Sequence, residues 1–129
     1  MNSSNKLVLV VEDFEDNRFM LRRLLEMAGY QVVEASDGEQ ALVMAQQERP
    51  ALILMDLSLP RLDGLAATRG IRQHPDLSDI PIVAVSAHDS ADFHAEALAA
   101  GCNDYVAKPI DFDQLAKLLT RVLGEGRGT

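Results

Sequence analysis

The sequence predicts an α/β fold, in which a doubly wound, five-stranded parallel sheet carries helices on both faces. Five short apolar runs alternate with five longer amphipathic segments along the 129 residues. Three of the short runs are almost continuously apolar, which is typical of parallel strands that are covered on both faces. Because the connections are short, right-handed crossovers place helices on both sides of such a sheet.

The apolar runs are rich in Val, Ile and Leu, and we predict a strand for each of them. These runs are residues 7–11, 31–35, 52–55, 82–85 and 104–107. The first, third and fourth are the most uniformly apolar, so we expect them at the centre of the sheet. The second and the fifth are expected nearer its edges.

The first two amphipathic segments carry signals for the start and the end of a helix. A stripe with i, i+3, i+4, i+7 spacing predicts the first helix, and Gly29 ends it. The stripe consists of Leu21, Leu24, Leu25 and Ala28. Asp37 is the predicted cap of the second helix, with Gln40 as its return partner, and Pro50 follows the helix. Its buried side is expected to be Ala41, Leu42 and Ala45.

The next two helices are bounded by proline and glycine. We predict the third over residues 64–73, because the residue before Pro75 avoids the helical conformation. Asp89 or Ser90 can cap a fourth, alanine-rich helix that ends at Gly101. Its only large apolar anchors are expected to be Phe93 and Leu98.

The fifth helix has the clearest pattern, with Asp111 as its cap and Gly124 after its last turn. Its apolar stripe consists of Leu115, Leu118, Leu119, Val122 and Leu123. We expect a single domain over residues 1–129, with a core from about residue 6 to residue 123 and short loose termini.

The composition excludes several classes of protein. A hydrophobic content of 47% is too high for a disordered chain. No apolar run approaches the ~18 residues that span a bilayer, and residues 1–6 are too polar for a signal peptide. The formal net charge of −8 argues against a nucleic-acid surface. Cys102 is the only cysteine, so no intrachain disulfide can form, and we expect a cytoplasmic protein.

Polar residues follow the predicted strands at their carboxyl ends, where sites form in open α/β sheets. They are Glu12 and Asp13 after the first strand, Asp56 after the third, Ser86 after the fourth and Lys108 after the fifth. Each residue alone is compatible with an ordinary helix cap, turn or surface charge. Their separations along the chain are large, so only this fold brings them together at one edge.

The combination of these residues predicts a site for a cation and an anion. A trio of carboxylates repels itself unless a cation lies among its members. Hard oxygen ligands with room for water favour Mg²⁺. Lys108 adds a point charge for an anion, and Ser86 adds a hydroxyl donor. We interpret this arrangement as a site that accepts a phosphoryl group.

The chain resembles the receiver domains of two-component response regulators from Lys6 to about Leu123. The matching motifs are VVED at 10–13, LMD at 54–56, LP at 59–60, DG at 63–64, VSA at 85–87, GCNDY at 101–105 and KP at 108–109. The DNR stretch at 16–18 and the LLE stretch at 24–26 also resemble receivers that work with hybrid histidine kinases. The resemblance implies a flavodoxin-like fold with strand order 2-1-3-4-5.

The resemblance also implies a role for each matching residue. Asp56 would be the phosphoacceptor. The Mg²⁺ site would consist of Asp13, Asp56, Glu12 and the backbone carbonyl of Ser58. The phosphoryl oxygens would be bound by Ser86 and Lys108. The switch that reports phosphorylation would be Ser86 together with the aromatic residue Tyr105.

Two residues depart from the family pattern. Glu12 stands where many members carry Asp, which leaves open whether its longer side chain binds the metal directly or through water. Leu59 replaces a common Met, a change that conserves volume. Two further residues have no role in the pattern. Cys102 is expected to be a small buried hydrophobe, and His88 either borders the site or faces solvent.

The resemblance implies a stand-alone response regulator that switches protein–protein interactions. It would take its phosphoryl group from a phosphohistidine of a sensor kinase, a hybrid kinase or a histidine phosphotransfer protein. A downstream protein would dock on the face made by the fourth helix, the fifth strand and the fifth helix. Such a chain assists its own phosphorylation and dephosphorylation without being a turnover enzyme. Neither a nucleic-acid partner nor a membrane partner is implied.

Three other functions fit parts of the pattern. Haloacid-dehalogenase-type phosphatases also use a strand-end Asp, but they carry a second Asp two residues later, where Ser58 stands here. A flavodoxin-like electron carrier would need a phosphate-binding loop after the first strand, where Glu12 and Asp13 would repel the cofactor. A receiver-like binding module that is not phosphorylated usually lacks one or more of the site groups, and all five are present here.

Overall fold

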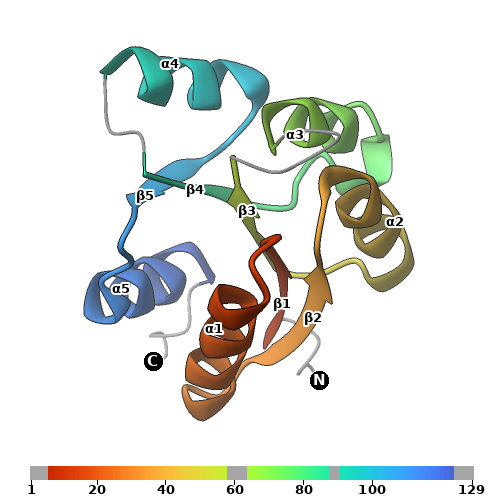
Figure 1. The fold of residues 1–129 in the computed structure, drawn as a ribbon. Coiled ribbons are helices and arrows are strands. Elements are labelled where there is room, and N and C mark those ends of the chain that lie inside the picture. Colours follow the sequence, from red (N-terminus) through yellow and green to blue (C-terminus); the bar gives the residue numbers. More distant parts are fainter. Residues whose placement is uncertain (1–5, 58–63, 88–90, 124–129) are drawn as a thin grey trace.

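Residues 6–57, 64–87 and 91–123 are described by a computed structural model, in which five parallel strands form one sheet with five α-helices around it (Figure 1). The elements in chain order are β1 (Leu7–Val11), α1 (Glu15–Met27), β2 (Gln31–Ala35), α2 (Gly38–Glu48), β3 (Leu52–Asp56), α3 (Gly64–Arg72), the 3₁₀ turn η2 (Pro75–Leu77), β4 (Ile82–Ser86), α4 (Ala91–Ala100), β5 (Asp104–Ala107) and α5 (Phe112–Leu123). The strand order β2-β1-β3-β4-β5 confirms the predicted fold. No helix in the described ranges is both long enough and apolar enough to cross a membrane.

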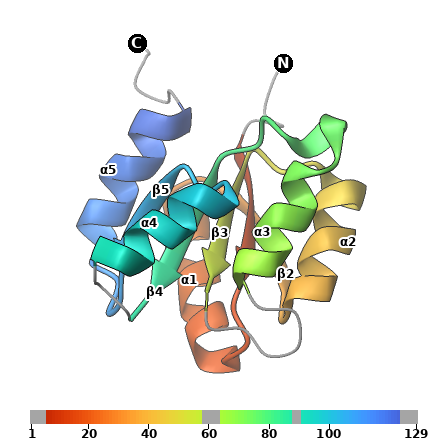
Figure 2. The same ribbon diagram turned by 90° about the horizontal axis from the view of Figure 1, so that it is seen from above.

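The sheet is the middle of three layers. Helices α1 and α5 cover one face, and α2, α3 and α4 cover the other, which is turned toward the viewer in Figure 2. Side chains alternate between the faces along each strand. In β1, Leu9 and Val11 pack in the core beneath α2, α3 and α4, while Val8 and Val10 pack with α1 and α5. Each face of the sheet therefore buries an apolar core of its own.

The central strands are the ones that the apolar pattern predicts. Every residue of β3 and β4 is buried, whereas the edge strands β2 and β5 are partly exposed. β3 and β4 each extend one residue further than predicted, since Asp56 pairs with Val85 and Ser86 pairs with Ala107. These two polar residues are thus held within the sheet and not in the loops that follow it.

The helix signals in the first half of the chain are confirmed with small differences. In α1, Leu21 and Leu25 are buried, but Ala28 is exposed just beyond the last helical turn. The backbone then turns at Gly29, where φ is +100°, a conformation that glycine adopts without strain. Asp37 caps α2 by accepting a hydrogen bond from the Gln40 backbone N–H at 2.8 Å. The Gln40 side chain accepts a hydrogen bond from the Ser36 backbone N–H, and not from the backbone N–H of Asp37 as a capping box would have it.

At the other end of the chain, α5 begins with the predicted cap, since the Gln114 N–H donates to Asp111 at 3.3 Å. The predicted caps of α4 and the glycine after α5 lie outside the described residues. They are Asp89, Ser90 and Gly124. The 3₁₀ turn η2 was not predicted, and it occupies the proline-containing segment between α3 and β4.

The expectation that both Phe93 and Leu98 anchor α4 is wrong for Leu98, whose side chain is 59% exposed. Residues five apart lie about 140° apart around a helix, so they cannot share one face. Phe93 packs against the core, and α4 otherwise buries the small residues Ala97 and Ala100. Because small side chains bury little apolar area, α4 is held less firmly than a helix with a leucine stripe.

Gly64 begins α3 so close to β3 that a side chain would meet the backbone. A Cβ there would lie against the Asp56 carbonyl oxygen and 2.6 Å from the Leu57 Cα. We predict that Gly64→Ala lowers the free energy of unfolding by about 1–3 kcal/mol, because the neighbouring backbone cannot move away without strain. Gly70→Ala in the same helix is the control. Its Cβ would meet only the flexible Leu42 side chain, at 3.1 Å, and alanine is the better helix former. Equal stability of the two variants in urea unfolding would contradict the close approach.

Candidate functional site

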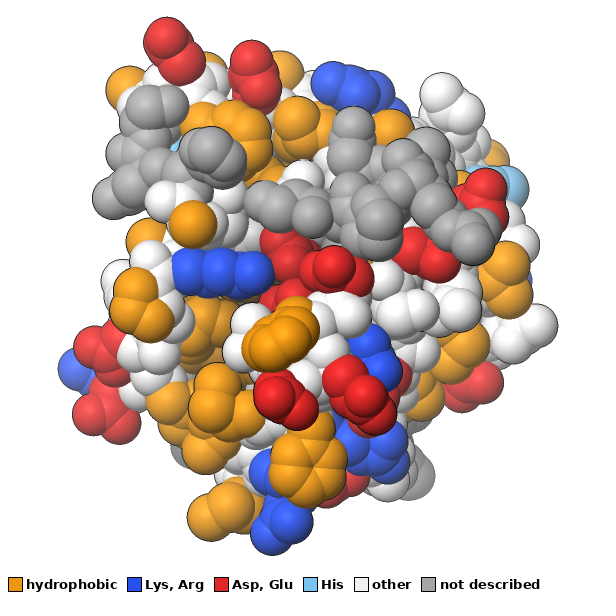
Figure 3. All heavy atoms as spheres, viewed as in Figure 1, with side chains coloured by type: hydrophobic (Ala, Val, Ile, Leu, Met, Phe, Trp, Pro, Cys, Tyr) orange, Lys and Arg blue, Asp and Glu red, His pale blue; other side chains and the backbone are white. Residues whose placement is uncertain are grey.

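The carboxyl ends of four strands bring together the polar residues that the sequence separates. Glu12 follows β1, Asp56 ends β3, Ser86 ends β4 and Lys108 follows β5. Because parallel strands run in one direction, their carboxyl ends meet at one edge of the sheet. Acidic side chains lie beside a basic one near the centre of the face that Figure 3 shows.

Three carboxylates form a compact cluster at this edge, which we call the acidic cluster. One oxygen from each of Glu12, Asp13 and Asp56 lies within 4.8 Å of the others. Glu12 and Asp56 are only 3% and 2% exposed, while Asp13 faces solvent. Closely spaced carboxylate oxygens that are open to water on one side fit Mg²⁺, which keeps several of its water ligands. The residues present therefore fit the cation that the sequence predicts.

The ammonium group of Lys108 lies against both buried carboxylates. Its Nζ is 3.1 Å from Asp56 Oδ2 and 3.3 Å from Glu12 Oε1. Burial by itself lowers the pKa of Lys108, but the hydrogen bond to Asp56 and the charges of Asp56 and Glu12 outweigh it and raise the pKa above its ordinary value. Lys108 is therefore charged at neutral pH and offsets one of the three carboxylate charges.

Burial is the main reason why the pKa of the Glu12 carboxyl is raised, and the nearby charge of Asp56 raises it further. Two contacts act in the opposite direction. The Phe14 backbone N–H donates to Glu12 Oε2 at 3.1 Å, and Lys108 supplies a positive charge. The net increase in the pKa means that the charged form of Glu12 is disfavoured where it lies, mainly by burial, and a nearby positive charge would favour it.

Ser86 is fully buried at the end of β4, beside Lys108. The Lys108 backbone N–H donates to the Ser86 carbonyl oxygen at 2.9 Å, and the Leu57 N–H donates to the Val85 carbonyl oxygen at 3.0 Å. These bonds continue the sheet past the ends of β3 and β5. The chain segments that carry Asp56, Ser86 and Lys108 are therefore held side by side by the backbone itself.

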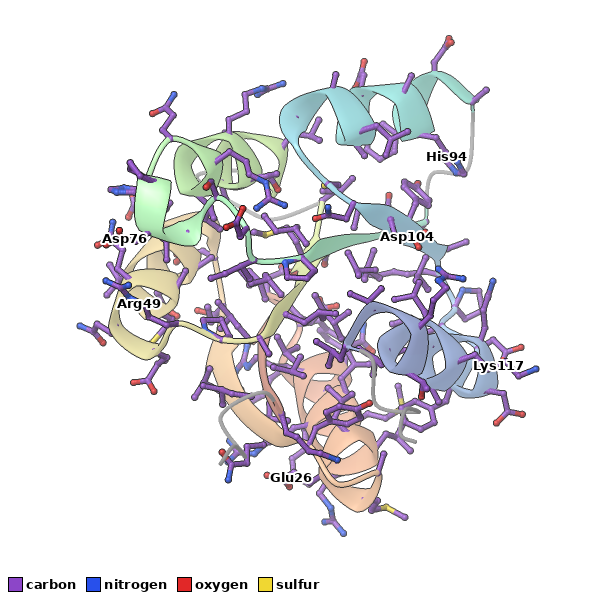
Figure 4. All side chains as sticks on the ribbon, turned by 180° about the vertical axis from the view of Figure 1, so that it is seen from behind. Glu26, Arg49, Asp76, His94, Asp104 and Lys117 are labelled. Carbon is purple, nitrogen blue, oxygen red and sulfur yellow. The ribbon has the colours of Figure 1, made fainter. Side chains whose placement is uncertain are left out.

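Tyr105 is a partly buried residue of β5, the strand that we expected near an edge of the sheet. Its ring lies against two side chains of α4, with ring centroids 3.8 Å from His94 and 6.4 Å from Phe93. In Figure 4, His94 stands at one end of α4, above the strand that carries Asp104. The Tyr105 hydroxyl is buried and has no hydrogen-bond partner among the described residues.

Cys102 is a small buried residue, as expected. It is 5% exposed, and its Sγ lies 3.8 Å from Thr68 Oγ1. Burial raises the pKa of the Cys102 thiol, which keeps it protonated and unreactive at neutral pH. Three other residues singled out in the sequence lie outside the described residues: Ser58, Leu59 and His88.

Two arginines of α1 and a glutamate of β2 form a network that contacts the backbone of the acidic cluster, and they were not predicted as part of the site. Arg18 of α1 donates to the Glu12 carbonyl oxygen at 2.9 Å and to Glu34 of β2 at 3.0 Å. Arg22 donates to the other oxygen of Glu34 at 2.8 Å. Although burial raises the pKa of Glu34, the hydrogen bonds from Arg22 and Arg18 outweigh it and lower the pKa. An acid within a mainly apolar strand, with arginines four residues apart in the preceding helix, is the signal that could have revealed this network.

A pocket of about 390 Å³ opens beside the acidic cluster. It is lined by Glu12, Asn17, Met20, Leu21, Ala87, Lys108, Pro109 and Ile110. Met20 is half exposed, and Phe14 and Phe19 nearby on the chain are 56% and 58% exposed. The pocket thus joins two charged side chains of the site to the exposed apolar side chain of Met20.

The chain is similar to proteins of one family. A family model for the response regulator receiver domain matches residues 8–120. The chain is 35% identical over 120 residues to the polar-differentiation response regulator DivK of Brucella anthropi, and the match covers 93% of this chain and 98% of that relative.

Two solved structures are also similar to the chain. One is the receiver domain of the sensor histidine kinase PA1611 from Pseudomonas aeruginosa, with a magnesium ion coordinated in its active-site cleft (39% identity, TM-score 0.86, 92% and 98% of the two chains). Another is a chain of the co-crystal structure of the Saccharomyces cerevisiae histidine phosphotransfer protein Ypd1 and the receiver domain of its response regulator Ssk1 (32% identity, TM-score 0.81, 88% and 86%).

We predict that Glu34→Gln lowers the free energy of unfolding at pH 7 by about 1 kcal/mol, because Arg18 and Arg22 lose their shared partner. The folded-state pKa of Glu34 is below its ordinary value. Its charge therefore stabilises the fold above the unfolded-state pKa, and this contribution is lost as the pH falls through the folded-state pKa. The difference from the parent should shrink below about pH 4 in urea unfolding, and no such change is expected for Glu96→Gln on the exposed surface of α4. A difference that is constant with pH would contradict this role of the charge.

Proposed function

The chain belongs to the response regulator receiver domain family, and from this membership we propose that Asp56 is the residue on which it is phosphorylated. Receiver domains belong to two-component signal transduction, and the function of this family is to be phosphorylated on an aspartate. The observation that carries the proposal is the position of Asp56. Its buried carboxylate ends the central strand β3, belongs to the acidic cluster and lies 3.1 Å from the Lys108 ammonium group.

In the proposed reaction, Asp56 acts as the nucleophile. One carboxylate oxygen attacks the phosphorus of a phosphohistidine, a P–O bond forms, and the P–N bond breaks with its electron pair left on the donor imidazole. The donor is a sensor kinase, a hybrid kinase or a histidine phosphotransfer protein. The similarity to the co-crystal structure that contains a phosphotransfer protein and a receiver supports this class of donor.

Receiver domains bind Mg²⁺ at their acidic pocket, and the acidic cluster here fits that ion. We assign its ligands to Asp13, Asp56, Glu12 and the backbone carbonyl of Ser58. A bound Mg²⁺ ion neutralises negative charge on the carboxylates and on the transferred phosphoryl group. Lys108 and Ser86 would then bind the phosphoryl oxygens through an ammonium group and a hydroxyl group. Ser86 ends β4, which pairs with β3, and the Lys108 ammonium group reaches Asp56 from the end of β5, one strand further along the sheet, which supports this assignment.

The protein acts as a phosphoacceptor switch. We propose that it assists its own phosphorylation and dephosphorylation and catalyses no other turnover. A cytoplasmic location is supported by the lone cysteine, Cys102, and by the class of donor.

The pocket beside the acidic cluster is our candidate for the surface on which the donor protein docks. Transfer requires the phosphohistidine to lie within bonding distance of Asp56 while its carrier covers the site. Glu12 and Lys108 form the side of the pocket next to Asp56, and Met20 offers exposed apolar area on α1. Docking there would bring the donor to the open side of the acidic cluster and exclude water from it.

We propose that a downstream protein docks on the face made by α4, β5 and α5. The phosphoryl oxygens would draw the Ser86 hydroxyl inward, and Tyr105 would follow into the space beside α4. A buried hydroxyl without a described partner, as in Tyr105, favours such a movement. Turning a switch from nearly off to nearly on needs ~5 kcal/mol of differential stabilisation. Two or three charge-assisted hydrogen bonds to the phosphoryl group can supply energy of that order.

We predict that a small phosphodonor such as acetyl phosphate adds one phosphoryl group to the protein in the presence of Mg²⁺, because the cation offsets the repulsion between the acidic cluster and the incoming group. Asp56→Asn should abolish the mass increase, and EDTA should prevent it. Asp76→Asn is the control. Asp76 lies on η2, away from the carboxyl ends of the strands, and its carboxylate pairs with Arg49 at 3.1 Å (Figure 4). Intact-protein mass spectrometry measures the product, and label that survives Asp56→Asn would refute the assignment.

We predict that Ser86→Ala still accepts a phosphoryl group but no longer reshapes α4, because it lacks the hydroxyl that couples the site to Tyr105. Beryllofluoride, which mimics the phosphoryl group, should change the amide NMR shifts of α4 and Tyr105 in the parent and leave them nearly unchanged in Ser86→Ala. Ser78→Ala, in the exposed segment before β4, should behave as the parent does. Shifts confined to the surroundings of Asp56 in the parent would rule out the proposed movement.

A further inference from the structure

The Arg18 guanidinium joins the acidic cluster to the neighbouring strand β2. Its Nη1 donates to the Glu12 carbonyl oxygen at 2.9 Å, and its Nε donates to Glu34 Oε1 at 3.0 Å. The Arg18 side chain is only 18% exposed, so it is held within the structure. The Glu12 backbone N–H, in turn, donates to the Ala35 carbonyl oxygen at 3.1 Å. The two backbone polar groups of Glu12 are therefore tied to two different elements, β2 and α1.

The Glu12 carbonyl belongs to the peptide that connects Glu12 with Asp13. Because a peptide group is planar, fixing its oxygen also fixes the direction in which the chain enters Asp13. The Asp13 side chain is exposed, so packing around it contributes little to its position. The hydrogen bond from Arg18 thus fixes the backbone that carries the one exposed carboxylate of the acidic cluster.

Arg18 is itself held in place, and its charge is offset. Glu34 receives Arg18 on one oxygen and Arg22 on the other, at 3.0 Å and 2.8 Å. A free arginine this close to the acidic cluster would repel a divalent cation. Pairing with Glu34 removes much of that repulsion while the guanidinium keeps its position on Glu12.

We propose that Arg18 is a positioning residue of the metal site: it fixes the peptide between Glu12 and Asp13 and thereby raises the affinity of the acidic cluster for Mg²⁺. The inference rests on the proposed function, in which the acidic cluster holds that ion. Groups that orient metal ligands typically contribute about 10–100-fold to metal affinity. Arg18 acts through a backbone peptide and not on a ligand oxygen, so we expect about tenfold, the lower end of that range.

The inference is tested by calorimetric titration of Mg²⁺ into the unphosphorylated protein. Arg18→Gln should raise the Kd about tenfold. Arg18→Lys keeps the charge but lacks the planar fork that reaches Glu12 and Glu34 at once, so it should weaken binding to a similar degree. Arg23→Gln is the matched control. It removes the same charge from the same helix, where the guanidinium lies over the Phe19 ring, and it should leave the Kd unchanged.

Two further measurements separate positioning from a general loss of structure. In EDTA, the amide NMR shifts of residues 12 and 13 should change in Arg18→Gln but not in Arg23→Gln, while both variants unfold cooperatively. With a small phosphodonor, the Mg²⁺ concentration for half-maximal phosphorylation should rise about tenfold in Arg18→Gln, and the rate at saturating Mg²⁺ should stay close to that of the parent. If Arg18→Gln does not fold, Arg18→Lys supplies the same comparison.

Three outcomes would overturn the positioning role. A folded Arg18→Gln variant that binds Mg²⁺ as tightly as the parent would show that the bond to Glu12 is not needed. Tighter binding would show that the charge of Arg18 matters more than its geometry. An Arg18→Lys variant equal to the parent would show that any positive charge suffices. A parent that binds no Mg²⁺ would instead overturn the proposed function of the acidic cluster itself, whatever the variants do.

Discussion

The site depends on holding two carboxylates side by side where water hardly reaches them. Glu12 and Asp56 are almost fully buried, so their charged forms are poorly solvated, and each repels the other. Lys108 contacts both and offsets part of this cost. Asp13 then adds negative charge on the solvent side. The three carboxylates outnumber the one ammonium group, which distinguishes this edge from a structural ion pair. A divalent cation bound there would offset the remaining negative charge.

The parallel sheet is what keeps this unfavourable arrangement in place. Asp56 and Ser86 are the last paired residues of the two most deeply buried strands, and backbone hydrogen bonds continue past them to Lys108. Repulsion between the carboxylates cannot move the backbones that carry them apart without breaking the sheet. Helix α4 is held less firmly, because the apolar side chains that it packs into the core are alanines and Phe93. The protein thus combines a rigid site with one weakly anchored helix, which is the combination that a switch requires.

The sequence was a better guide to elements than to contacts. The strands follow from apolar runs and the helix ends from Gly29, Asp37 and Asp111, because these signals depend on residues close to each other in the chain. Leu98 shows where the pattern failed: the apolar residues of α4 were too few to define a face, so its orientation could not be derived. The roles of Arg18 and Glu34 were not predicted for a related reason: a charged residue is expected on the surface unless its partner is known.

The sequence by itself determined that polar residues lie at the carboxyl ends of four strands, and hence that Glu12, Asp13, Asp56, Ser86 and Lys108 share one edge. That inference needs only the order of the elements and the common direction of parallel strands. The tertiary structure alone decided that the Lys108 ammonium group contacts both buried carboxylates, that Arg18 binds the Glu12 carbonyl, and that Tyr105 lies under His94. Such contacts depend on strand register and on the rotation of each helix about its axis. Both are set by how the whole core packs, which no local pattern in the chain encodes.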